Sequence, residues 1–161
     1  MESKFITHTN DTPFFSLKGL KTNSRIVNII DGDTIVLILP IFDGFYKFYT
    51  RLSNIDTCEI HSNNNEVKEK GITAKYRVIE LITNKKYESM NLSKKDIIKI
   101  FNDNIYIVNI ECDDFDKYGR LLGNIFVNEK NVGDILCDEK LAYRYYGLKK
   151  LSDEDQLKTL T

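Results

Sequence analysis

Between positions 25 and 53 the chain carries three short runs of β-branched and aromatic residues that are separated by turn residues and not by helices. Arg25–Ile30 and Thr34–Leu39 are rich in isoleucine, valine and leucine, and the triplet Asp31–Asp33 separates them. Phe45–Ser53 follows, with its more apolar side chains at alternate positions. Such residues, with a period of two between turn signals, are typical of strands. The pattern predicts a three-stranded meander, which limits the fold more than any other feature of the sequence.

A helical period begins after the polar residues Asn63–Asn65. Isoleucine and tyrosine then recur every three or four residues, which predicts an amphipathic helix over Glu66 to about Asn84. The residues with this spacing are Ile72, Tyr76, Ile79 and Ile82. Ser93, followed three residues later by Asp96, resembles a capping box. It predicts a short second helix that ends near Phe101.

The C-terminal third predicts two more strands and a further helix. Ile105–Cys112 and Arg120–Val127 are interpreted as strands on either side of the turn Asp116–Gly119. A helix is expected near Val132–Lys140. After Leu141–Tyr146, the charged tail has room for one or two helical turns. This part of the chain therefore adds a strand pair to the first three strands.

The order of three strands, helices, two strands and a helix suits a small closed barrel. We expect an α+β fold, namely a five-stranded OB-fold β-barrel with about three helices packed against it. The 161 residues suffice for one core and are too few for two. Residues 1–23 lack clear periodicity and are interpreted as an N-terminal extension, and residues 24–161 as the OB-fold domain. Fold alone leaves the function open.

The charge and hydropathy of the chain give no support for a membrane protein or for a strongly basic nucleic-acid binder. The net charge is −1, so composition gives no support for binding of nucleic acid by overall electrostatics. The longest apolar run, Ile35–Phe42, is interrupted by Pro40 and is far shorter than the ~20 residues of a membrane helix. We therefore expect no membrane association and see no sign of an obligate protein partner.

The N-terminus and the cysteines indicate an intracellular protein. Met1–Leu20 has no basic segment followed by an apolar one, as a secretory signal peptide would have. The cysteines are few, scattered and without a CxxC spacing, which argues against a disulfide framework and against a zinc site. They are Cys58, Cys112 and Cys137. We expect a cytoplasmic or otherwise intracellular location, in a host cell if the source is viral.

Asp31-Gly32-Asp33-Thr34 is the first segment that could carry chemistry. Asp-Gly is a favoured turn dipeptide, so a plain turn is the simplest interpretation. An EF-hand is excluded, because the twelfth position counted from Asp31 is Phe42, where that loop needs a bidentate glutamate.

Two further segments combine charges in an unusual way. Arg51 lies at a predicted strand end, and two carboxylates, Asp56 and Glu59, follow within nine positions. Carboxylates suit a hard divalent cation, and a guanidinium suits a phosphate. Asp116–Arg120 is a predicted tight turn in which Gly119 supplies a positive φ. Solvated loop charges and turns would explain each segment alone, whereas the three segments in this order are specific.

The segments IIDGDTIVLI, RLSNIDTCE and DKYGRLLG, followed by LAYRYY, resemble those of the staphylococcal nuclease (thermonuclease) family in type and order. The resemblance covers roughly Arg25 to Gly147, with the predicted helix 66–84 in the place of the family's first helix. It implies an SNase-like OB-fold domain and an enzyme. That enzyme would be a calcium-dependent nuclease that hydrolyses phosphodiester bonds of DNA, RNA or both by attack of water and leaves 3′-phosphate ends.

The resemblance also implies a metal site and a base. Asp33 and Asp56 match the carboxylate ligands of a calcium ion, and Thr57 matches the residue that adds its backbone carbonyl. Asp31 would lie behind these ligands. Glu59 matches the carboxylate proposed to orient or deprotonate the attacking water.

The remaining matched residues would contact the substrate. Arg51 and Arg120 match the family's two phosphate-binding arginines. A further set matches positions near the terminal phosphate and the nucleotide base. These residues are Lys117, Tyr118, Tyr143 and Tyr145.

The chain departs from the family pattern in several places. Cys58 stands where the family usually has a proline, at a position that is not a ligand. Pro40–Phe48 is longer than the family's hairpin loop, and Glu88–Phe101 resembles an insertion before the fourth strand. The helical region at the C-terminus is short. Well-known members are strongly basic and this chain is not, which leaves its affinity for long polymers open.

The alternative to an enzyme is a catalytically weak or inactive module that binds nucleic acid or protein on the same barrel. Relatives of this fold persist as interaction domains after losing their active sites. Binding alone does not require all the matched acids and arginines, and this chain retains them. His61 as a base and Cys58 as a nucleophile are weaker hypotheses, since a lone loop histidine is usually just exposed and nearby carboxylates disfavour a thiolate.

Overall fold

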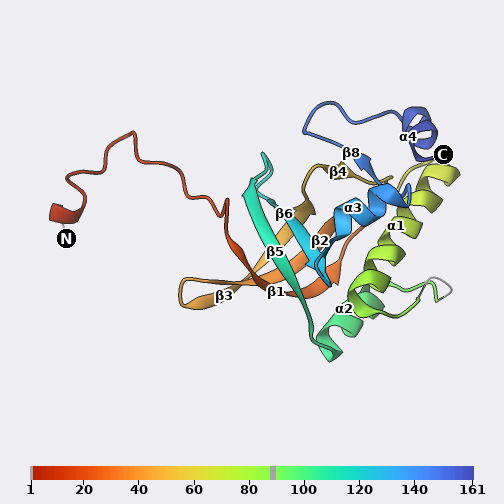
Figure 1. Cartoon of the computed structure of the whole chain (residues 1–161), viewed down its shortest axis with the longest axis horizontal. Coiled ribbons are helices and arrows are strands. Elements are labelled where there is room, and N and C mark those ends of the chain that lie inside the picture. Colours follow the sequence, from red (N-terminus) through yellow and green to blue (C-terminus); the bar gives the residue numbers. More distant parts are fainter. Residues whose placement is uncertain (1, 88–89) are drawn as a thin grey trace.

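The computed structural model describes residues 2–87 and 90–161, and these residues form a closed five-stranded β-barrel (Figure 1). Its strands are β1 (Lys21–Ile29), β2 (Thr34–Ile41), β3 (Gly44–Leu52), β5 (Tyr106–Phe115) and β6 (Leu121–Val127). They follow the order β3-β2-β1-β5-β6 with antiparallel neighbours, and a parallel pairing of β3 with β6 closes the ring. The short β7 (Lys130–Asn131) continues the sheet beyond β6. The predicted OB-fold barrel is confirmed.

Alternation along β2 fills the inside of the barrel. Ile35, Leu37 and Leu39 are fully buried. Ile35 pairs with Thr50 of β3 and Leu37 with Phe48, and paired residues share a face of the sheet. The predicted meander is therefore confirmed, with its apolar face turned to the core.

The predicted helices lie outside the barrel, toward the right of Figure 1. In the described ranges they are α1 (Asn65–Thr83), α2 (Lys94–Asp103), α3 (Val132–Asp138) and α4 (Asp153–Leu160). A 3₁₀ turn at Glu2–Lys4, which was not predicted, lies at the opposite end of the molecule (Figure 1). The capping box is present, since Ser93 and Asp96 exchange side-chain to backbone hydrogen bonds. Helix α4 forms in the charged tail, where one or two helical turns were expected. None of the helices in the described part of the chain combines the length and the apolarity needed to cross a bilayer.

Strands β1, β2 and β5 differ most from their predicted bounds, and β5 continues to Phe115 although the predicted strand ends at Cys112. The strand predicted to end at Leu39 runs through Pro40 to Ile41 and pairs there with β3, so that Phe42 and Asp43 alone form the turn between the two strands. Pro40 lies beyond Ile38, the last β2 residue paired with β1, so its missing N–H is tolerated at that point. Strand β1 begins at Lys21, which pairs with Glu111. The first residues of the predicted 88–101 insertion, 88 and 89, lie outside the described residues.

A second, two-stranded sheet joins distant segments. Strand β4 (Ile55–Asp56) pairs with β8 (Tyr143–Arg144), with Asp56 opposite Tyr143. Helix α1 packs beside the loop that leaves β4. Its Gly71 is so close to this loop that an added Cβ would overlap the carbonyl oxygen of Cys58. The helix therefore fixes the position of the chain on either side of Cys58.

Gly71→Ala is expected to lower the free energy of unfolding by about 1–3 kcal/mol, because the new methyl group overpacks this contact. Alanine favours a helix over glycine by up to about 1 kcal/mol, so the overlap must outweigh that gain. Denaturant unfolding measures the change. Lys68→Ala, on the exposed face of the same helix, is the control and should change stability by less than about 0.5 kcal/mol. A Gly71→Ala protein as stable as the wild type would contradict the close packing.

Candidate active site

One end of the barrel gathers the three charged segments. The turn before β2 carries Asp33, β3 ends one residue after Arg51, and the turn between β5 and β6 carries Arg120. Thr34 pairs with Arg51, and Arg51 pairs in parallel with Leu122. The register therefore brings together segments that are far apart in the sequence.

Arg51 is buried between two carboxylates. Its Nη2 donates a hydrogen bond to Asp56 Oδ1 at 2.8 Å and lies 3.7 Å from Asp33 Oδ2. The side chains of Arg51, Asp33 and Asp56 are 10%, 9% and 1% exposed. Charges removed from water to this extent must be paired, so each ionised group depends on the others.

Asp33 is held by groups on both of its oxygens. Oδ2 accepts a hydrogen bond from the N–H of Thr57 at 3.0 Å, and Oδ1 accepts one from the hydroxyl of Thr34 at 2.9 Å. Burial raises the pKa of Asp33, but hydrogen bonding to Asp31 and the charge of Arg51 outweigh it and hold that pKa below its usual range. Asp33 is therefore ionised at neutral pH.

Asp31 has the opposite character, because burial and the charge of Asp33 raise its pKa to about 7. Its Oδ1 accepts a hydrogen bond from the N–H of Asp33 at 3.3 Å. Gly32, between them, packs against α1, where a Cβ would lie 2.7 Å from Cβ of Ala74. Close packing explains this glycine, since its φ is not positive. Near neutral pH the Asp31 carboxyl is thus partly protonated.

Asp56 is bonded to a buried tyrosine. The Tyr143 hydroxyl donates to Asp56 Oδ2 at 2.5 Å, across the β4–β8 pair. Burial and the neighbouring Asp33 raise the pKa of Asp56 to about 6, while the Tyr143 hydrogen bond acts in the opposite direction. Tyr143 is 5% exposed and packs with Cys58 and Val67. It lies beneath the site, which differs from the expectation that it lines a base pocket.

Glu59 joins this group through a lysine that the sequence analysis missed. Lys150 Nζ donates to Glu59 Oε1 at 2.6 Å and lies 3.5 Å from Asp56 Oδ1. Lys150 belongs to the loop between β8 and α4, outside the family-like segments, so no motif pointed to it. The acids Asp33, Asp56 and Glu59 are therefore linked through the cations of Arg51 and Lys150.

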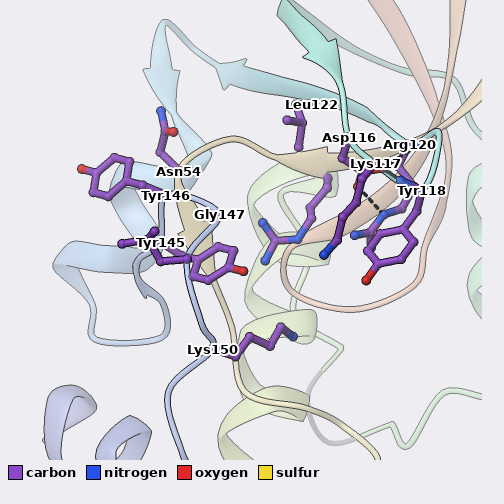
Figure 2. A pocket seen from close by; sticks show the side chains of 12 residues that line it. Asn54, Asp116, Lys117, Tyr118, Arg120, Leu122, Tyr145, Tyr146, Gly147 and Lys150 are labelled. Carbon is purple, nitrogen blue, oxygen red and sulfur yellow. Dashed lines mark hydrogen bonds and ion pairs between the residues drawn. The ribbon is translucent and has the colours of Figure 1, made fainter.

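An open pocket of about 510 Å³ lies beside the acids. Its cationic and aromatic wall residues are Arg51, Lys117, Arg120, Lys150, Tyr118, Tyr145 and Tyr146. Figure 2 shows Arg120 and Tyr118 on one side of the pocket and Tyr145 and Tyr146 on the other. Cations bind phosphate oxygens and tyrosine rings stack on bases, so the wall is chemically suited to a nucleotide.

Arg120 is positioned by its own turn. Its Nε donates to Asp116 Oδ2 at 2.7 Å, as the dashed line in Figure 2 marks. Asp116 Oδ1 accepts the N–H groups of Tyr118 and Arg120, both at 2.9 Å, and Gly119 adopts a φ of 82°. Burial raises the pKa of Asp116, but the hydrogen bonds of Arg120 outweigh this and lower it. The turn thus presents a guanidinium that is held by a fixed carboxylate.

Among the described residues, three cation–π contacts orient the tyrosines of the wall, and one of them joins Arg120 to Tyr118, with 5.6 Å between the guanidinium carbon and the ring centre. The guanidinium carbon of Arg51 lies 5.1 Å from the ring centre of Tyr145, and Lys117 Nζ lies 5.1 Å from that of Tyr118. The N–H of Tyr145 also donates to the carbonyl of Asn54 at 3.0 Å. Arg51 therefore belongs to both the acidic group and the pocket wall.

Within residues 2–87 and 90–161, no group of three or more His, Cys, Asp or Glu side chains is arranged to hold a metal ion. The donor types still suit calcium, which takes oxygen ligands from carboxylates, backbone carbonyls and water. Asp33 and Asp56 both contact Arg51 Nη2, and Thr57 directly follows Asp56. Burial, and after it the neighbouring Asp33, raises the pKa of Asp56, and a bound cation would favour the ionised form of both acids. On donor chemistry the residues fit calcium.

Comparison with known proteins decides the family. A family model described as staphylococcal nuclease homologue matches residues 49–161. The chain belongs to this family. The matched range includes Arg51, Asp56, Glu59 and Arg120, whereas Asp33 precedes it.

The chain is also similar to the uncharacterized protein MJ1439 of Methanocaldococcus jannaschii. The two are 28% identical over 137 residues, which cover 75% of this chain and 56% of the relative. The chain thus spans little more than half the length of this relative. The relative's name assigns no activity, so it adds no substrate to the family assignment.

Asp31 is expected to make stability depend on pH. Its pKa of about 7 lies above the ordinary 3.8, so the folded state binds this proton more tightly than the unfolded state does. That stabilisation is present below about pH 4 and is lost as the pH rises through about 7. The free energy of unfolding of the wild type should therefore fall between about pH 5 and pH 8. In Asp31→Asn this fall should be smaller, by on the order of 1–2 kcal/mol.

Urea unfolding at a series of pH values, with a chelator present, measures this difference. Asp11→Asn, at an exposed N-terminal position, is the control and should follow the wild type. Parallel curves for the wild type and Asp31→Asn would show that Asp31 is not the titrating group.

Proposed function

We propose that this protein is a calcium-dependent nuclease that hydrolyses phosphodiester bonds of DNA, RNA or both. The observation that carries the proposal is the arrangement of Arg51 and Arg120 on one pocket, with Arg51 in contact with Asp33 and Asp56. Membership of the nuclease family supports it. A surface that only binds a polyanion needs cations and no acids, because acids repel the polyanion. The buried acids beside Arg51 therefore favour a catalytic site over a binding surface.

The arginines would bind the scissile phosphate. A guanidinium presents several N–H donors in a plane and can hold two phosphate oxygens at once. Arg120 uses its Nε for Asp116, and no hydrogen bond from its Nη atoms to another residue is found in the described ranges. Both guanidinium groups would neutralise charge that builds up on the phosphate oxygens during attack.

The acids would serve the metal and the water. Asp33, Asp56 and the Thr57 carbonyl would hold a calcium ion, which when bound supplies positive charge against the phosphate oxygens. Glu59 would orient the attacking water and accept its proton as the new O–P bond forms and the bond to the leaving oxygen breaks. A positioned base of this kind contributes about 10²–10⁴-fold to the rate.

The remaining residues would bind the nucleotide or support the ligands. Lys117 and Tyr118 would contact a neighbouring phosphate and sugar, and Tyr145 would pack against the base. Tyr143 would act from beneath, through its hydrogen bond to Asp56. The tyrosines add a binding contribution that does not depend on overall charge, which matters in a chain of net charge −1.

A binding module without activity is the second candidate. The cationic and tyrosine-rich wall of the pocket would serve binding alone equally well. It would need the arginines and tyrosines of the wall but not the acid Glu59.

Calcium is expected to support fragmentation of single-stranded DNA, duplex DNA or RNA, and a chelator should abolish it. Gel analysis of the products after incubation with the purified protein separates the two candidates. Fragments that form only with calcium support the nuclease. A substrate that is retarded but intact in both conditions would support the binding module instead.

Arg120→Ala is expected to lower kcat by about 10²–10³-fold, because a donor to the charged transition state is lost. The melting temperature should stay close to that of the wild type, since the Arg120 side chain is 35% exposed. Arg144→Ala is the matched control, because Arg144 pairs with Asp134 outside the pocket. Equal activity of the Arg120→Ala and wild-type proteins would count against the proposed site.

A further inference from the structure

Lys150 connects the pocket to the acid proposed as the base. Its ammonium donates a hydrogen bond to Glu59 Oε1 at 2.6 Å and lies 3.5 Å from Asp56 Oδ1. Figure 2 shows its side chain reaching into the pocket from the loop below Tyr145. The ammonium group of Lys150 therefore contacts two carboxylates, Asp56 in β4 and Glu59 in the loop after it.

The ion pair between Lys150 and Glu59 is expected to contribute little to the free energy of folding. The side chains of Lys150 and Glu59 are 47% and 54% exposed, and exposed ion pairs add little to folding free energy. Asp56, by contrast, is 1% exposed, so its charge acts on Lys150 with less screening. Burial lowers the pKa of Lys150, but the Glu59 hydrogen bond and the charge of Asp56 outweigh this and raise it. The lysine thus remains charged beside the acids.

Glu59 has little else to orient it. It lies on the loop after β4, and Lys150 is the partner that its carboxylate contacts by hydrogen bond or ion pair in the described residues. A base must lie within hydrogen-bonding reach of the water that it activates, and small displacements reduce the rate strongly. A carboxylate on a loop needs a partner that limits its rotamers.

We propose that Lys150 is a positioning residue for Glu59, which it holds beside Asp56 at the edge of the phosphate pocket. The inference rests on the proposed function, because it takes Glu59 as the base of that reaction. Lys150 could instead bind the phosphate directly, as Arg51 and Arg120 would. The two roles differ in whether the effect of Lys150 requires Glu59.

A double-mutant cycle with Lys150→Ala and Glu59→Gln tests the inference. Lys150→Ala alone should lower kcat by at least about tenfold, with a change in KM below about threefold. In the Glu59→Gln background the same substitution should change kcat by less than about twofold, because the group that Lys150 positions is already inactive. Lys150→Arg, which keeps the charge and a donor, should recover part of the rate.

Binding without turnover gives a second readout. Calorimetry with a nucleoside 3′,5′-bisphosphate and calcium should give a similar Kd for Lys150→Ala and the wild type, whereas loss of a direct phosphate contact would raise it about tenfold or more. Lys149→Ala, the exposed neighbouring lysine, is the matched control for charge and should match the wild type in rate and Kd. Melting temperatures of all variants show whether each is folded.

The outcomes distinguish the positioning role of Lys150 from the proposed nuclease activity. Loss of the Lys150→Ala effect in the Glu59→Gln background supports the positioning role. An equal loss of kcat in both backgrounds, a raised Kd or an unchanged kcat would overturn it and leave the nuclease assignment intact. A wild-type protein that cleaves no nucleic acid with calcium would overturn both.

Discussion

The guanidinium of Arg51, buried between Asp33 and Asp56, is the interaction on which the site depends. It ties the turn before β2 to the end of β3 and to β4, and it places two acids at one rim of the barrel. Removing one partner from such a buried group typically costs about 3–5 kcal/mol, since the remaining charge loses its compensation. The same carboxylates are the ones proposed to hold calcium. A cation bound there would take over part of their charge, and Arg51 would then be less strongly held and better able to engage a phosphate.

Negative and positive groups are therefore paired with one another inside the site. The pocket wall is cationic, yet the chain as a whole carries a net charge of −1. Lys150 and Arg51 each contact both the acidic group and the pocket, so they neutralise the acids on the side where a phosphate would approach. Weak overall attraction to a polyanion would be compensated by contacts at one nucleotide, with Tyr118 and Tyr145 on opposite sides of the pocket.

Most of the fold was predictable because its signals are local. The β-branched and apolar run Thr34–Leu39 and the capping box at Ser93 each depend on a few neighbouring residues, and the strand and the helix start that they predict are both confirmed. The predicted end of the second strand at Leu39 was wrong, because Pro40 lies where the strand has one neighbour and its missing N–H is tolerated, and only the sheet register shows that. The convergence of the charged segments followed from a family resemblance. The contact of Lys150 with the acids depends on the path of the loop before α4, for which the sequence has no periodic signal.

The parallel pairing of β3 with β6 is the seam that closes the barrel, and it is short: the paired residues are Thr50–Leu52 and Leu121–Gly123. Arg51 lies in this seam, and Arg120 directly precedes its other strand. A ligand bound by both arginines would therefore hold β3 and β6 together. Ligand occupancy and closure of the barrel are then linked equilibria, so an occupied site resists the opening that leads to unfolding. The shortest strand pairing of the barrel and the proposed substrate contact therefore coincide, and a bound substrate would stabilise that pairing.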